Sequence, residues 1–194
     1  MSASVHLPDL VRSLLFLGLV LHKVVWEILK RPDRPQRRAA LSLRLRLVKA
    51  LKVLVLGFLL VQTLFLDVLP ISSAPALLQL VGGALYLLGL GAAITARVQL
   101  GRNWLDLESF DVLPGQTIVN RGIYRYVRHP IYTGDLFLVT GLELALNSWL
   151  VLAVVPLALF VVKQVLAEET LLSRTFASYA RYCAETKRFI PFVV

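Results

Sequence analysis

Charge is scarce in this chain of 194 residues, since only 17% of them are Asp, Glu, Lys or Arg. A soluble globular domain has about 25% charged residues. Here 57% of the residues are hydrophobic and the mean hydropathy is +0.72. A domain of this size has too little interior to bury such an excess, which excludes a soluble enzyme and a disordered chain. The single cysteine, Cys183, closes no intrachain disulfide and excludes a disulfide-stapled scaffold.

Acidic residues are scarcer still, with 12 Asp and Glu against 21 Lys and Arg, and the formal net charge is +9. Nine of the basic residues fall between positions 30 and 52, where Asp33 is the only acid. This cluster separates two long apolar segments, which is typical of a cytoplasmic loop under the positive-inside rule. A nucleic-acid-binding arm more often lies at a terminus or on a soluble domain. We therefore expect a membrane-embedded protein with no nucleic-acid partner.

Apolar runs predict an all-α protein with five membrane-spanning helices, at about 11–29, 47–69, 76–97, 130–146 and 149–169. The first run is the weakest, because His22, Lys23 and Glu27 interrupt its second half. The basic loop, the 97–130 loop and the tail then share one side of the membrane. This places the N-terminus outside and the C-terminus in the cytoplasm. We expect one domain over residues 1–194.

A polar segment precedes the fourth run and ends in Arg128, His129 and Pro130. Proline is favoured in the first helical turn, so a helix is expected to begin at Pro130. The unpaired amides and positive dipole of such a helix start suit an anion, and Gly134 would let a ligand approach the backbone. The alternative is a basic membrane edge with Tyr132 and its neighbours as interfacial residues.

Four acids lie in or near the last two apolar runs. Glu168 and Glu169 are expected at the C-terminus of the fifth helix, where they oppose the helix dipole unless a ligand cation offsets it. They can equally mark the point where the helix leaves the bilayer. Acids within a membrane span are candidates for function: Asp135 is expected near the Arg128 cluster, and Glu143 near a hydrated outer interface. His6 and His22 have no Cys, His, Asp or Glu partners at metal-ligand spacing, so no metal site is expected.

Three motifs follow one another between positions 100 and 191. They are Leu-Gly-Arg-Asn-Trp at 100–104, Gly-Ile-Tyr-Arg-Tyr-Val-Arg-His-Pro-Ile-Tyr-Thr-Gly at 122–134, and Glu-Glu at 168–169 with Phe176, Tyr179, Tyr182 and Arg-Phe-Ile-Pro at 188–191. In this order they closely resemble the isoprenylcysteine carboxyl methyltransferase family. The resemblance covers roughly residues 80–194. The five-span layout is similar to that of prokaryotic members, which implies the inner (plasma) membrane.

The resemblance implies a membrane methyltransferase that uses S-adenosyl-L-methionine and acts on a membrane lipid or a lipidated small substrate. Its cytoplasmic cofactor pocket is built from the last two helices, the 97–130 loop and the tail. The implied cofactor-binding residues are Ile118, Val119, Tyr124, His129, Pro130, Tyr132, Gly134, Glu168 and Glu169. The implied substrate residues are Arg102, Asn103 and Trp104. Arg128 is expected to hold a carboxylate acceptor. For an amine acceptor, as in the related phospholipid N-methyltransferases, Glu168 is the expected base.

Two positions depart from the family pattern: Leu105 replaces a hydroxyl residue, and Gln116 replaces a histidine. Both lie in a variable loop, so the acceptor stays open between O-, N- and S-methylation. Membrane sterol reductases, which use NADPH, share a similar motif that continues into an acid, as this chain does at Asp135. A non-enzymatic membrane scaffold is the remaining alternative; it explains the apolar runs but not the ordered motifs.

Overall fold

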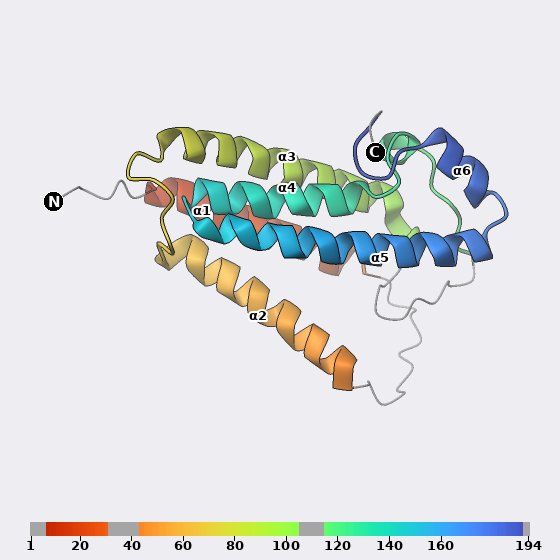
Figure 1. Ribbon diagram of the computed structural model, residues 1–194, viewed down its shortest axis with the longest axis horizontal. Coiled ribbons are helices and arrows are strands. Elements are labelled where there is room, and N and C mark those ends of the chain that lie inside the picture. Colours follow the sequence, from red (N-terminus) through yellow and green to blue (C-terminus); the bar gives the residue numbers. More distant parts are fainter. Residues whose placement is uncertain (1–6, 31–42, 105–114, 192–194) are drawn as a thin grey trace.

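The computed structural model describes residues 7–30, 43–104 and 115–191, and these residues form helices and no β-strand. The α-helices are α1 (Asp9–Ile28), α2 (Leu43–Phe65), α3 (Ala76–Leu100), α4 (Pro130–Ala145), α5 (Val154–Thr175) and α6 (Tyr179–Glu185). The 3-10 turns are η1 (Gly101–Asn103), η2 (Gly122–Arg125) and η3 (Trp149–Ala153). Helices α1, α3, α4 and α5 run alongside one another, whereas α2 leans away from them (Figure 1). The predicted all-α class is confirmed.

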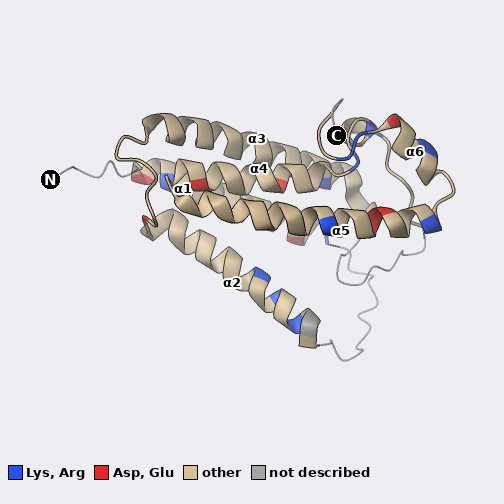
Figure 2. Cartoon of the chain, viewed as in Figure 1, with Lys and Arg blue, Asp and Glu red and all other residues tan. Residues whose placement is uncertain are grey.

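Three stretches among the described residues are long and apolar enough to cross a membrane. They are Arg46–Phe65 in α2, Ala76–Leu100 in α3, and Trp149–Thr175, which joins η3 to α5. They coincide with the second, third and fifth expected spans. The Lys and Arg residues of α2 all lie in its first half, and the rest of that helix carries no charge (Figure 2). The first and fourth expected spans also form helices, α1 with 20 residues and α4 with 16. The five-span layout stays a prediction.

The fifth helix extends further than expected. Helix α5 continues past Glu168 and Glu169 to Thr175, so the two acids lie inside the helix and not at its C-terminus. The chain then turns through an extended Phe176 into the short α6. Leu172 lies on this added stretch of α5, one turn beyond Glu168, and both side chains line the same pocket. The added turns of α5 therefore contribute Leu172 to the pocket wall.

Helices α3 and α4 pack through glycines, so that their backbones come into contact. A Cβ added to Gly82 or Gly89 of α3, or to Gly141 of α4, would collide with the backbone of the facing helix. At Gly134 an added Cβ would lie 2.7 Å from the backbone nitrogen of Ala93. The expectation that Gly134 opens the backbone to a ligand is therefore wrong, because α3 occupies that space. Small residues at helix interfaces serve such close approach in membranes.

Alanine at Gly82 is expected to force α3 and α4 apart and to destabilise the protein by about 1 to 3 kcal/mol. Its neighbour Gly83 is the matched control, since a Cβ there meets no atom within 4 Å. Thermal unfolding in detergent should show a lower midpoint for Gly82→Ala and an unchanged or higher midpoint for Gly83→Ala. Equal midpoints for the two variants would contradict the glycine contact.

A buried polar network joins α1, α2 and α4 at the end of the bundle far from Pro130. Arg12 donates to the backbone oxygens of Gln62 and Thr63, at 3.3 and 3.1 Å, and pairs with Asp67. The side-chain amide of Gln62 donates to Glu143 at 3.0 Å. Glu143 is only 2% exposed, so its expected hydrated position is wrong. Hydrogen bonds within the protein replace water around this carboxylate.

Candidate active site

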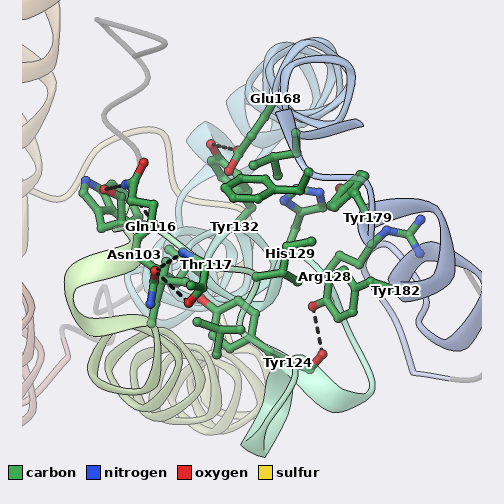
Figure 3. A pocket seen from close by; sticks show the side chains of 17 residues that line it. Asn103, Gln116, Thr117, Tyr124, Arg128, His129, Tyr132, Glu168, Tyr179 and Tyr182 are labelled. Atoms are coloured by element: carbon green, nitrogen blue, oxygen red, sulfur yellow. Dashed lines mark hydrogen bonds between the residues drawn. The ribbon is translucent and has the colours of Figure 1, made fainter. Parts of the chain in front are cut away.

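A pocket opens at the end of the bundle where α3 ends and α4 begins (Figure 3). Its walls come from η1, the segment 116–119, η2, the start of α4, the last turns of α5, and α6. Nine of the catalytic, cofactor and substrate residues expected from the sequence line it: Asn103, Trp104, Ile118, Val119, Tyr124, Arg128, His129, Tyr132 and Glu168. Residues separated by up to 65 positions are thus brought together at one site.

Three other expected residues do not line the pocket. Pro130 begins α4 as predicted, Gly134 faces α3, and Glu169 pairs with Arg128. The side chain of Arg102 lies outside the described residues. Sequence reasoning did not assign Thr117 and Leu100 to the site, although both line the pocket. The helical spacing from Glu168 could have indicated Leu172, which is four residues further on.

The paired glutamates of α5 have different surroundings. Glu168 lines the pocket, and its Oε2 accepts a hydrogen bond from the hydroxyl of Tyr132 at 3.1 Å. Glu169 is 12% exposed and lies among two arginines and a histidine. Its carboxylate lies 2.9 Å from Arg128 Nε, 3.2 Å from His129 Nε2 and 2.8 Å from Arg188 Nη2. Glu168 is therefore the glutamate that faces the pocket, which the sequence left open.

The C-terminal tail is held against the segment that leads into α4. The backbone amides of Arg128 and His129 donate to the carbonyls of Lys187 and Arg188, at 2.8 and 3.1 Å. The amide of Lys187 donates in return to Tyr126 at 3.0 Å. These amides before the helix, close to the expected anion site, are thus satisfied by the tail. Arg188 also donates two hydrogen bonds to Glu169, which attach the tail to α5. These bonds raise the pKa of the Arg188 guanidinium.

Arg128 lines the pocket, but its guanidinium serves the same tail. Beside Glu169, it donates to the carbonyl of Cys183 at 3.2 Å and to that of Thr186. A guanidinium with these partners is oriented by the protein itself. Arg128 therefore holds α6 and the tail beside the pocket.

Aromatic rings cover much of the pocket wall: Trp104, Tyr124, Tyr132, Phe176, Tyr179 and Tyr182. The hydroxyl of Tyr182 donates to the carbonyl of Tyr124 at 2.8 Å, which joins α6 to η2. Burial raises the pKa of both Tyr124 and Tyr182, so their hydroxyls stay neutral at physiological pH. Neutral rings around a carboxylate are chemically suited to a cationic ligand, because ring faces attract positive charge.

A second wall is formed by the turn after α3 and by segment 116–119. The side-chain oxygen of Asn103 accepts a hydrogen bond from the backbone amide of Thr117 at 2.7 Å. Gln116 donates through its side-chain amide to the carbonyl of Trp104 at 3.3 Å. These bonds link two segments that lie on either side of the undescribed residues 105–114.

Asp135, expected near the Arg128 cluster, belongs to a different contact. Its carboxylate lies 2.9 Å from His22 Nε2 on α1, and it does not line the pocket. His22 in turn stacks on Trp26, with 3.9 Å between ring centroids. The sequence offers His22 no acidic partner at metal-ligand spacing. The fold brings it one from a distant position, Asp135.

A family model described as phospholipid methyltransferase matches residues 77–179, just over half of the chain. The match includes α3, η1, η2, α4, α5 and most of the pocket wall. The chain belongs to the phospholipid methyltransferase family. No curated protein matches the sequence.

This phospholipid methyltransferase family member also shares its fold with a solved structure. That structure is the eukaryotic intramembrane Ras methyltransferase, isoprenylcysteine carboxyl methyltransferase, with a TM-score of 0.63 and 20% sequence identity. The similarity covers 98% of this chain and 70% of that chain. Together, family and fold confirm the predicted resemblance to membrane methyltransferases of this type.

Proposed function

We propose that this protein transfers the methyl group of S-adenosyl-L-methionine to a lipophilic acceptor in the membrane. The observation that carries the proposal is the carboxylate of Glu168 in an aromatic pocket at the end of an apolar helical bundle. Membership of the phospholipid methyltransferase family supports the same reaction class. The lipid-facing helices support an acceptor that is a membrane lipid or a lipidated small molecule.

The donor set of the pocket fits this cofactor, whose sulfonium and ammonium groups are cationic. Glu168 and the neighbouring rings of Tyr124 and Tyr132 suit positive charge. We assign His129 and the segment Ile118–Val119 to the same binding wall. When bound, the cofactor supplies an electrophilic methyl group. The residues of this chain then act by orienting the two reactants and excluding water, since a displacement depends on alignment.

An amine acceptor is the version of this reaction that the charges favour. Glu168 can accept the proton that an ammonium group must lose before it attacks. A carboxylate acceptor needs a cation instead, and Arg128 is the only Lys or Arg among the described lining residues. Because Arg128 is bonded to Glu169 and to tail carbonyls, we assign it to positioning the tail. O-methylation of a carboxylate remains the second candidate, with Arg128 in the role that the sequence indicated.

We further propose that residues 1–194 form one five-span domain in a prokaryotic inner membrane, with the pocket on the cytoplasmic side. The single cysteine tests this orientation, because Cys183 lies on α6 and is partly exposed. A membrane-impermeant maleimide should label Cys183 in inside-out vesicles but not in right-side-out vesicles. A Cys183→Ser, Ser73→Cys variant, with its cysteine in the loop at the opposite end, should give the reverse. Labelling of Cys183 from the outside contradicts the proposed topology.

Calorimetric titration of the detergent-solubilised protein tests the cofactor assignment. We expect S-adenosylhomocysteine to bind and NADPH to give no heat of binding. Binding of NADPH alone would overturn the proposal and favour a reductase, in which Asp135 acquires a role. Binding of neither ligand would favour the non-enzymatic scaffold.

A further inference from the structure

Arg97, in the last turn of α3, is an arginine with only 2% exposure at the pocket end of the bundle. Its Nη2 donates to the carbonyl of Leu29 at 2.6 Å, and its Nη1 donates to the carbonyl of Gly101 at 3.0 Å. Leu29 caps the C-terminus of α1, where a cation also favours the helix dipole. Gly101, with a φ of 53°, begins the turn that leads to Asn103 and the pocket. One guanidinium thus joins the ends of two helices.

The same guanidinium lies over the ring of Trp104, 5.0 Å from its centroid. Trp104 lines the pocket, whereas Arg97 does not. On another side Trp104 meets the ring of Trp26 edge-on, with 6.3 Å between centroids. Trp26 lies on α1 and is itself stacked on His22, whose partner is Asp135 of α4. Trp104 is therefore held between α3 and α1.

We propose that Arg97 is a positioning residue, which fixes Trp104 as a wall of the pocket by fastening the end of α1 to the turn after α3. The family match begins at residue 77, so α1 lies outside it. In this chain α1 helps to shape the pocket, because Leu29 accepts a hydrogen bond from Arg97 and Trp26 packs against Trp104. Neither residue of α1 lines the pocket itself. That Trp104 contacts a bound ligand rests on the proposed function. That Arg97 holds Trp104 in place does not.

Fluorescence of Trp104 tests the inference without any ligand. The chain has three tryptophans, and a Trp26→Phe, Trp149→Phe background leaves Trp104 as the only one. The first of these two changes keeps an aromatic edge against the Trp104 ring. In that background, Arg97→Met should shift the emission to longer wavelength and increase quenching by acrylamide. Arg97→Lys should give an intermediate result, because lysine keeps the charge over the ring but cannot hold both carbonyls in the same planar geometry.

Arg12→Met is the matched control. Arg12 is also buried and also donates to carbonyls at the end of a helix, but it lies at the opposite end of the bundle. The Arg12→Met change should lower the thermal midpoint while leaving the Trp104 emission and quenching unchanged. If Arg97→Met proves unstable, the comparison is made between Arg97→Lys and Arg12→Lys. Unchanged Trp104 fluorescence in a folded Arg97 variant overturns the inference.

A second measurement connects the wall to ligand binding. Arg97→Lys should weaken the binding of S-adenosylhomocysteine by about five- to tenfold, because lysine cannot hold both carbonyls and Trp104 is then less firmly placed. Arg12→Lys should leave that affinity unchanged. If the parent protein binds no S-adenosylhomocysteine, the proposed function fails while the fluorescence result still decides the role of Arg97. If the parent binds and Arg97→Lys binds equally well, the positioning role fails.

Discussion

Glutamine in place of Glu169 is expected to destabilise the protein by about 3 to 5 kcal/mol, the usual cost of removing one partner from a buried ion pair. The carboxylate of Glu169 is shared by Arg128, His129 and Arg188, from the segment before α4 and from the tail. Without it, the partly buried guanidinium groups of Arg128 and Arg188 lose their counter-charge. For a chain of this size, the change corresponds to a fall in melting midpoint of at least ~6 °C.

Thermal unfolding in detergent, followed by circular dichroism, measures this effect. Glu168→Gln is the control, since it removes the same charge one residue earlier on the same helix. Glu168 faces the pocket and accepts its hydrogen bond from a neutral group, the hydroxyl of Tyr132. A fall of equal size in both variants would show that Glu169 has no special part in holding the tail.

Glutamine in place of Glu168 should instead impair cofactor binding and turnover while leaving the fold intact. A hydrogen bond to a charged group contributes about 1.5 to 3 kcal/mol, so S-adenosylhomocysteine is expected to bind about 10- to 100-fold more weakly. With an amine acceptor, turnover should fall further, because glutamine cannot accept the proton. The measurements are calorimetric titration and transfer of a radiolabelled methyl group to membrane lipids.

Tyr132→Phe provides the comparison for Glu168→Gln. It removes the hydroxyl that donates to Glu168 and leaves the charge in the pocket. The loss of this hydrogen bond, at the lower limit of about 1.5 kcal/mol for a bond to a charged group, predicts roughly tenfold weaker binding. A Glu168→Gln variant with unchanged affinity and turnover would exclude Glu168 from the site, and the pocket would need another group for the cofactor cation.

Local rules were enough for part of this architecture. The helix start at Pro130 follows from the fixed φ of proline and its missing amide proton. The apolar runs located α2, α3 and α5 because a span needs about 20 apolar residues whatever its neighbours are. The pocket wall from Tyr124 to Tyr132 was indicated by a motif of consecutive residues, so little tertiary information was needed.

The different surroundings of the paired glutamates could not be predicted in this way. Adjacent residues on a helix point about 100° apart, so one of the two must face away from any pocket. Which one depends on where α4 and the tail pack, and Arg188 is 19 residues further along the chain. The same limit applies to Asp135, whose partner His22 is 113 residues away. The partner of Glu143, Gln62, is 81 residues away.

The glycine contact between α3 and α4 also decides how the pocket can open. Because the backbones touch at Gly82, Gly89 and Gly141, the two helices have no room to slide or rock against each other and should move as one rigid body. The pocket residues at the end of α3 and at the start of α4 then keep a fixed separation. Exchange of a bound molecule should then involve the other walls of the pocket. Where it requires displacement of α5, α6 and the tail, the lifetime of a complex should follow the strength of the contacts made by Glu169.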